Sequence, residues 1–311
     1  MQASTIQAMA SPRRMSRRRR RHIMTGYLYL TPWLLGFLLF WLGPAAASLA
    51  LSLTSYDVIS APSFIGLKNY VDAFTSDPLF VPSLYKTLYF AGTSVPAGLL
   101  LSLGAALLLN QKIRGTSFFR TLFFMPSLLP IVASTVLWAW LLQPDWGLVN
   151  GLLYRIGIHG PRWFASTEWA IPGLISLALW TTIGGPRMII FLAGLQGVPE
   201  ELYDAAAIDG ASRWQRFRHV TVPMITPTIF FNLVLGVIGA LQVFTSAYVA
   251  TAGGPAYATW FYAVNIYYQA FQYFNMGYAA ALSWLFAVLI VTLTWTQFRL
   301  SRSWVHYAEG E

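Results

Sequence analysis

Long apolar segments separated by short polar ones dominate this chain. Six segments are apolar almost throughout, and they cover residues 27–53, 87–110, 121–142, 169–192, 224–250 and 277–298. A helix of about 20 apolar residues crosses the hydrocarbon core of a bilayer, which is roughly 30 Å thick. The pattern therefore predicts an all-α membrane protein with six transmembrane helices.

The scarcity of charge supports this prediction. Hydrophobic residues make up 56% of the chain and charged residues 10%, whereas a typical soluble protein has about 25% charged residues. No Asp, Glu, Lys or Arg occurs between Arg218 and Arg299. The first apolar segment is longer than the roughly 7–15 residues of a cleavable signal sequence, which predicts a retained first helix.

The positions of Lys and Arg predict the orientation. If the N-terminus is inside, most of them fall on the cytoplasmic side, including the run 17–21, and the external loops carry only Lys68, Lys86, Arg155 and Arg162. Cytoplasmic loops of membrane proteins carry the excess of Lys and Arg, so both termini are placed in the cytoplasm. We expect a cytoplasmic Arg-rich tail over 1–26, a membrane domain over 27–299 and a cytoplasmic tail over 300–311.

The net charge of +9 therefore indicates contact with anionic membrane lipid rather than with nucleic acid. Catalytic chemistry is not indicated, because the chain has no cysteine and its four histidines are scattered. The phosphate-binding loop Gly-x-x-x-x-Gly-Lys-Ser/Thr is missing, since no Gly-Lys pair occurs. We expect no enzymatic activity, cofactor or metal in this chain.

The polar loop over 199–223 carries the most information about function. Pro199 suits the first turn of a helix, and the acidic residues after it are favoured there by the helix dipole. Three alanines over 205–207 make a slim helix, and Gly210 ends it because glycine accepts a positive φ. A second, basic helix then returns to the membrane at Pro223. Composition alone also permits an ordinary amphipathic surface loop.

This loop resembles the EAA loop of binding-protein-dependent ABC importers, which reads Glu-Ala-Ala, then a glycine, then Ile-x-Leu-Pro. Asp204-Ala205-Ala206, Gly210 and Val220-Thr221-Val222-Pro223 occupy those places, with Asp for Glu and two Val for Ile and Leu. Four further elements agree in order, and they are Gly66 to Tyr70, Arg120 to Pro126, Phe191 to Gln196 and Gly253-Gly254-Pro255. Lys86-Thr87 departs from the family's frequent Asn-Thr. The resemblance covers roughly residues 27 to 299 and indicates the carbohydrate (maltose-type) branch.

The resemblance implies a type I ABC importer permease fold in the bacterial cytoplasmic (inner) membrane. It also implies a second homologous permease subunit or a second copy of this chain, two ABC ATPase subunits that hydrolyse ATP, and an extracytoplasmic solute-binding protein. The loop would be a coupling helix that docks on the ATPase. Its candidate coupling residues are Glu201, Asp204, Ala205, Ala206, Asp209, Gly210, Arg213 and Arg216.

The resemblance places the solute path near mid-membrane, on the fourth and fifth helices. The candidates there are Trp180, Thr182, Gly184, Arg187, Gly239, Gln242 and Val243. Gly236 and Gly239 would leave room for a ligand or for close helix packing. An arginine at the centre of a bilayer costs about 2.5–3.5 kcal/mol. Arg187 therefore either snorkels to the cytoplasmic side or lines the path and favours acidic solutes, such as uronic-acid oligosaccharides.

The expected function is thus ATP-driven import of a sugar or oligosaccharide, neutral or acidic. Two other classes stay open. One is a secondary transporter or channel in which the loop at 199–223 is only structural, and the other is a membrane anchor for a complex. Co-purification with a nucleotide-binding subunit would separate the importer from the secondary transporter, and solute-dependent ATPase activity would separate it from the anchor.

Overall fold

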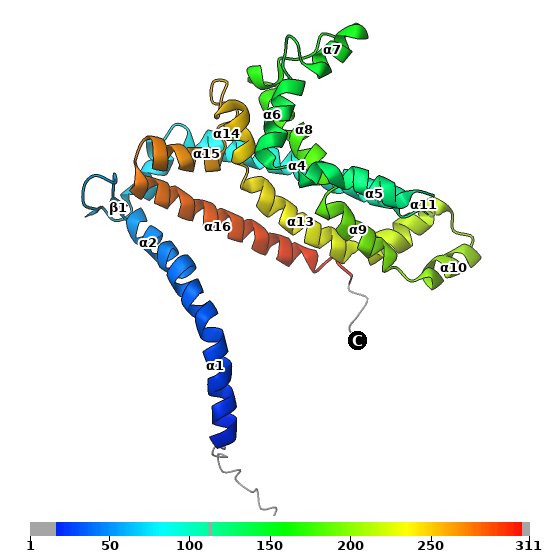
Figure 1. Cartoon of the computed structure of the whole chain (residues 1–311), viewed down its shortest axis with the longest axis horizontal. Coiled ribbons are helices and arrows are strands. Elements are labelled where there is room, and N and C mark those ends of the chain that lie inside the picture. The colour runs from blue at the N-terminus through cyan, green and yellow to red at the C-terminus, as the bar shows by residue number, and fades with distance from the viewer. Residues whose placement is uncertain (1–16, 112–113, 307–311) are drawn as a thin grey trace, which may run out of the picture.

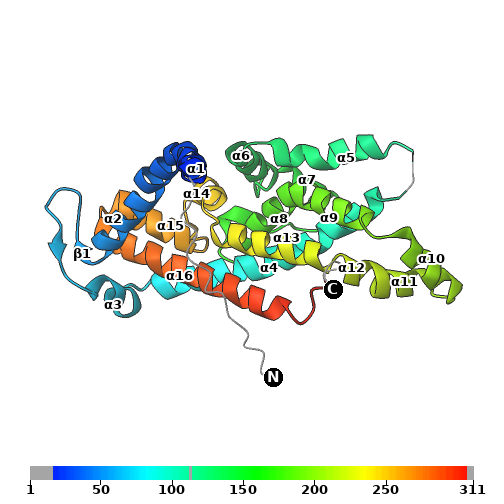
Figure 2. The same ribbon diagram turned by 90° about the horizontal axis from the view of Figure 1, so that it is seen from below.

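The computed structural model describes residues 17–111 and 114–306 (Figures 1 and 2). Three helices are long and apolar enough to cross a bilayer, and they span Met24–Ser52, Phe80–Leu109 and Met276–Ser301. Three bent helix pairs also qualify, and they are Thr116–Leu128 with Ile131–Leu141, Ala170–Ile183 with Pro186–Gln196, and Arg213–Met224 with Thr226–Leu241. These six units follow the order of the six predicted spans and confirm the predicted helical class. Residues 1–16 of the predicted tail over 1–26 and residues 307–311 of the predicted tail over 300–311 lie outside the described residues.

The first span leaves the body of the molecule (Figure 1). It consists of α1 (Arg17–Phe37), a π-helical turn over Leu38–Leu42 and α2 (Gly43–Ser52). Its most apolar stretch is 0% buried. An apolar surface of this extent needs lipid or another protein as its neighbour.

The second span, α4 (Phe80–Leu109), is the helix around which the other helices pack. It packs against α8 (Ala170–Ile183), α9 (Pro186–Gln196) and α13 (Thr226–Leu241). Its buried face carries a small residue every fourth position, and these are Ser94, Gly98, Ser102 and Ala106. Residues four apart share one helix face, and small residues let helix backbones approach closely.

Each bent pair breaks at identifiable residues. α5 (Thr116–Phe124) and the 3₁₀ turn Met125–Leu128 meet α6 (Ile131–Leu141) at 95°, across the extended residues Leu129 and Pro130. α8 and α9 meet at 46°, where Gly185 is extended and Pro186 opens α9. A residue before proline favours extended backbone, and proline fits the first turn of a helix.

The fifth predicted span, 224–250, is not continuous. α13 is bent by 64° from the preceding segment and ends at Leu241, and α14 (Thr245–Thr251) begins after three irregular residues. Hydropathy fails to show this break because both sides of it are apolar. Apolarity reports the surroundings of a segment and not the continuity of its helix.

Several short elements lie together at one end of the molecule (Figure 2). They are β1 (Thr54–Ser55), β2 (Ser63–Phe64), α3 (Lys68–Thr75), α15 (Tyr262–Tyr267), the π-helical turn Tyr268–Gln272 and the start of α16 (Met276–Ser301). The buried Asn69 side chain donates to the carbonyls of Ser52 at 2.8 Å and Thr54 at 2.9 Å. Asn69 therefore fastens α3 to the end of the first span. A separate helix, α7 (Leu148–Arg155), projects beyond α6 (Figure 1).

The opposite tip is formed by the loop between the fourth and fifth spans (Figures 1 and 2). It contains α10 (Glu200–Ile208), α11 (Arg213–Arg216), the π-helical turn Phe217–Thr221 and α12 (Val222–Met224). The end of the described chain folds back beside this region. The backbone N–H of His306 donates to the Thr226 hydroxyl at 2.9 Å, and Trp304 packs edge-on against Phe230.

We predict that Asn69→Ala destabilises the protein by about 1–3 kcal/mol, because two backbone carbonyls lose their buried donor. The thermal unfolding midpoint of the purified protein in detergent should fall by several degrees. Lys68→Ala, an exposed change one residue away, is the matched control and should leave the midpoint unchanged. Equal midpoints for the two variants would contradict the role given to Asn69.

Candidate functional site

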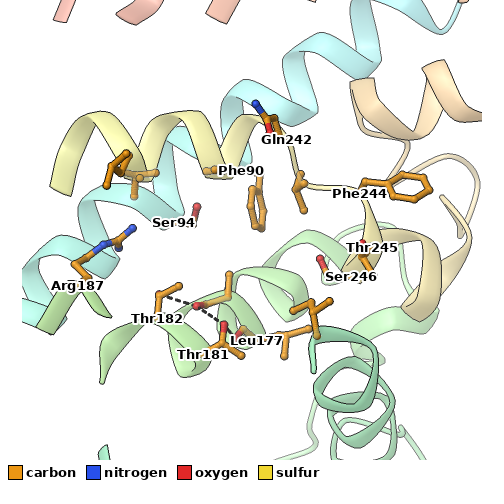
Figure 3. Close-up of a pocket in the computed structure, with 18 residues that line it drawn as sticks. Phe90, Ser94, Leu177, Thr181, Thr182, Arg187, Gln242, Phe244, Thr245 and Ser246 are labelled. Carbon is orange, nitrogen blue, oxygen red and sulfur yellow. Dashed lines mark hydrogen bonds between the residues drawn. The ribbon is translucent and has the colours of Figure 1, made fainter. Parts of the chain in front are cut away.

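A cavity of about 370 Å³ lies among α4, α8, α9, α13 and the start of α14 (Figure 3). The break after α13 lines it, and Thr182 and Arg187, which flank the break in the fourth span, line it too. Its polar or charged lining residues are Ser94, Thr181, Thr182, Arg187, Gln242, Thr245 and Ser246. Its apolar lining includes Phe90 and Phe244. The cavity thus combines a single cation with hydroxyl groups and aromatic rings.

The guanidinium of Arg187 lies at one end of this cavity (Figure 3). It fits between two helices because Gly98 and Gly236 carry no side chain. A Cβ added at Gly98 would lie 2.5 Å from Nη1 of Arg187, and one at Gly236 would lie 2.9 Å from Nη2. Arg187 also belongs to the first turn of α9, where the helix dipole is positive.

Within the described residues, no hydrogen bond or ion pair reaches the Arg187 side chain. A half-buried guanidinium without a partner is unusual, since buried charges are normally paired. The arginine and the helix dipole together make this end of the cavity suited to an anion. Of the two interpretations of Arg187, the side chain placement matches the one in which it faces the cavity.

Hydroxyl groups line the rest of the cavity. Ser94 on α4 is 7% exposed, and its hydroxyl makes no hydrogen bond within the described chain. Thr181 and Thr182 donate to backbone carbonyls of their own helix, including Ala178 at 3.0 and 2.7 Å. Their oxygens keep lone pairs that can accept a hydrogen bond from a ligand.

Aromatic side chains lie away from the arginine, with Phe244 at the far end beside Thr245 and Ser246 (Figure 3). Phe90 lies edge-on to Phe261, with ring centroids 5.4 Å apart. Phe244 stacks on Tyr248 at 5.5 Å. Fixed rings beside hydroxyl groups can hold a ligand that has both apolar faces and polar edges.

Five of the seven predicted path residues line this cavity, and they are Thr182, Arg187, Gly239, Gln242 and Val243. The other two do not. Trp180 faces α6, where its ring lies 5.9 Å from the ring of Trp138. Gly184 is buried against the backbone of Phe123 in α5, so it serves close packing.

The sequence interpretation missed the contributions of α4 and α14. Ser94 belongs to the second span, and its spacing of four residues from Gly98 and eight from Ser102 is a signal that could have identified a face of small and polar residues. Phe244, Thr245 and Ser246 surround the break after α13. Two adjacent hydroxyl residues inside an apolar segment were the available signal there.

The tip of the molecule, which we call the α10–α11 tip (residues 200–216), is built by local hydrogen bonds. Gly210 has a φ of +76°, as predicted for a helix end. The N–H of Ala211 reaches the carbonyl of Ala206 at 2.9 Å and completes the turn. Ser212 and Gln215 then cap the start of α11 reciprocally.

The α10–α11 tip is largely exposed. All eight candidate coupling residues are exposed or half-buried. The acidic ones lie on α10 or at its end, the basic ones lie on α11, and Gly210 lies at the turn between the two helices. The eight are Glu201, Asp204, Ala205, Ala206, Asp209, Gly210, Arg213 and Arg216. Ile208 is 87% and Trp214 67% exposed. Large apolar side chains exposed on a projecting tip indicate a surface for protein contact.

A polar contact joins α10 to the π-helical turn that follows the tip. The Tyr203 and Thr221 hydroxyls are 2.9 Å apart, which joins α10 to the π-helical turn that leads into α12. This contact links α10 to the segment that leads through α12 to the bend at Ile225, where α13 begins.

The chain matches a known protein family and is similar in sequence to known proteins. Residues 95–306 match the model of the family described as binding-protein-dependent transport system inner membrane component. The chain is 40% identical over 300 residues to the probable ABC transporter permease protein YesP of Bacillus subtilis, covering 95% of this chain and 96% of that one. It is 33% identical over 288 residues to the trehalose/maltose transport system permease protein MalF of Thermococcus litoralis, with 91% and 95% covered.

A solved structure is similar over nearly the whole chain. It is a crystal structure of a bacterial alginate ABC transporter in complex with an alginate pentasaccharide-bound periplasmic protein. The TM-score is 0.82 at 26% identity, and the match covers 92% of this chain and 96% of that chain.

Two glycines of the same region should respond differently to a methyl group. We predict that Gly184→Ala lowers stability by about 1–3 kcal/mol, because its Cβ would overlap the Phe123 carbonyl. Gly239→Ala should fold normally, because nothing lies within 4 Å of its added Cβ. Yield and thermal unfolding midpoint in detergent measure both. Comparable losses in the two variants would show that Gly239 does not face open space.

Proposed function

Because the chain belongs to the family of binding-protein-dependent transport system inner membrane components, we propose that it is the permease subunit of an ATP-driven importer for an acidic carbohydrate. The observation that carries the proposal is the cavity with the unpaired Arg187 at one end and hydroxyl groups beyond it. A sugar ring with a carboxylate has the complementary groups.

The carboxylate of such a solute would pair with Arg187, which presents several donors in one plane. Sugar hydroxyls would bond to Ser94, Thr181 and Thr182, and the apolar faces of the rings would lie against Phe90 and Phe244. Support comes from the alginate transporter, because alginate is an acidic polysaccharide. The trehalose/maltose relative carries a neutral solute by name, so family membership does not fix the charge of the solute.

ATP-driven movement requires a connection from the cavity to an ATPase. In our proposal the α10–α11 tip docks on an ABC ATPase subunit through Ile208, Trp214 and the surrounding charges. Movement of the tip passes through Tyr203 and Thr221 to the bend at Ile225 and so to α13, which lines the cavity. ATP and magnesium belong to the ATPase subunits in this scheme.

The assembly contains a second permease, two ATPases and an external solute-binding protein. The exposed first span would lie against lipid and the second permease, whether a homologue or another copy. The α10–α11 tip and both termini face the cytoplasm in this arrangement, and β1, α3 and α15 face outward, where the binding protein docks. Support for the binding protein comes from the alginate complex, which contains a periplasmic one.

We predict that Arg187→Gln reduces uptake of an acidic oligosaccharide about tenfold or more, because a charge-assisted hydrogen bond contributes about 1.5–3 kcal/mol. Uptake of a neutral sugar of the same size should change little. The measurement is uptake into membrane vesicles with an alginate pentasaccharide and a neutral pentasaccharide as probes. Equal effects on the two probes would contradict an anion-binding role for Arg187.

We predict that Gly210→Leu uncouples the permease, because a branched side chain strains the positive φ at the end of α10. Uptake and transport-stimulated ATP hydrolysis should both fall at least tenfold, while the chain still inserts in the membrane. Gly197→Ala is the control, because Gly197 has an ordinary helical φ of −82°. Normal transport by the Gly210 variant would remove the coupling role from the tip.

A further inference from the structure

Three buried side-chain atoms of the described chain have no hydrogen-bond partner, and two of them lie on α6. These are the Oγ of Ser134 and the Nε1 of Trp138, one helical turn apart, whereas the third, Oε1 of Gln297, is on α16. Buried polar groups are almost always hydrogen-bonded, so each exception needs an explanation.

A matched residue on the same helix shows the contrast. Thr135 and Ser134 are both 0% exposed, but the Thr135 hydroxyl donates to the Ile131 carbonyl at 2.7 Å. Ser134 therefore differs from its neighbour in having an unused donor and acceptor. This is not a general property of hydroxyl residues in α6.

The position of α6 connects these atoms to the cavity. Ile131, the first residue of α6, lines the cavity, and α6 packs against α14, whose first residues Thr245 and Ser246 line it too. Both helices begin directly after a break in a span. The 95° bend at Leu129 and Pro130 separates the direction of α6 from that of α5.

We propose that α6 is a gate of the cavity and that Ser134 and Trp138 are solute-binding residues covered while the gate is shut. This rests on the proposed transport function. In this structure α6 lies against α8 and α14, and the two polar groups are buried without partners. When α6 swings away from α8 and α14, the hydroxyl and the indole N–H face the widened cavity and bond to sugar hydroxyls.

The energetics favour such a gate. An unsatisfied buried polar group destabilises the shut arrangement, and contact with water or a sugar removes that penalty on opening. The two groups suit a carbohydrate, since serine both donates and accepts and tryptophan offers an N–H donor beside a ring face. The shut gate is thus held by apolar packing and opposed by its own polar groups.

The chain has no cysteine, so Ser134→Cys introduces a single, nearly isosteric thiol. The assembled complex in membranes is compared in two states, nucleotide-free and trapped with ADP and vanadate. We expect a water-soluble maleimide to label this thiol at least tenfold faster in one of these states than in the other, with labelling measured on this subunit. Ser83→Cys is the control, because Ser83 is buried on α4 and its hydroxyl is bonded to Phe80. It should stay unlabelled in both states.

Ser134→Ala tests the energetic part. Removal of an unsatisfied hydroxyl should leave the melting temperature of the complex equal or higher, yet slow ATP hydrolysis with the binding protein about tenfold, because opening becomes harder. Trp138→Phe should act in the same direction, and Thr135→Val should stay within about twofold of wild type.

The outcomes separate the two proposals. A purified chain without an ATPase subunit overturns the proposed function and the gate with it. An intact complex in which Ser134→Cys labels equally in both states, or in which Ser134→Ala hydrolyses ATP at the normal rate, overturns the gate alone. At least tenfold faster labelling of Ser134→Cys in one state than in the other, together with near-normal ATP hydrolysis by Thr135→Val, supports α6 as the gate.

Discussion

The guanidinium of Arg187 lies where α4, α9 and α13 meet, and the helices can meet there only because Gly98 and Gly236 lack side chains. Two consequences follow from this one fit. Small residues along α4 let the neighbouring helices approach, and the space left between them holds a charge that no other described residue neutralises. The packing of the helices and the positive charge in the cavity therefore both depend on these two glycines. A larger residue at either glycine would change both.

The cavity also depends on the interruptions of the spans that surround it. α8 gives way to α9 at Gly185, α13 ends at Leu241, and α6 begins after Pro130. Irregular backbone at membrane depth is tolerated where it lines a cavity or is buried in protein. These breaks place the ends of several short helices beside the cavity. A continuous bundle of six straight helices would not offer this irregular lining.

The six spans and the turn at Gly210 followed from the sequence because hydropathy and glycine geometry are local properties. Five cavity residues were also found in advance, since they lie in the two spans that the resemblance singled out. Ser94 and Phe244 were missed because a cavity is formed by helices distant in sequence, and only their packing shows which faces meet. The bends at Leu129–Pro130 and after Leu241 were missed for a related reason, since both sides of each bend are equally apolar.

The backbone N–H of His306 donates to the Thr226 hydroxyl, and Trp304 packs on Phe230. This clasp joins the chain beyond α16 to the first turns of α13, directly after the bend at Ile225. The residues that follow α16 are thus fixed to α13 by one hydrogen bond and one ring contact. In the proposed coupling, a movement of the α10–α11 tip that reached α13 would therefore also displace the end of α16.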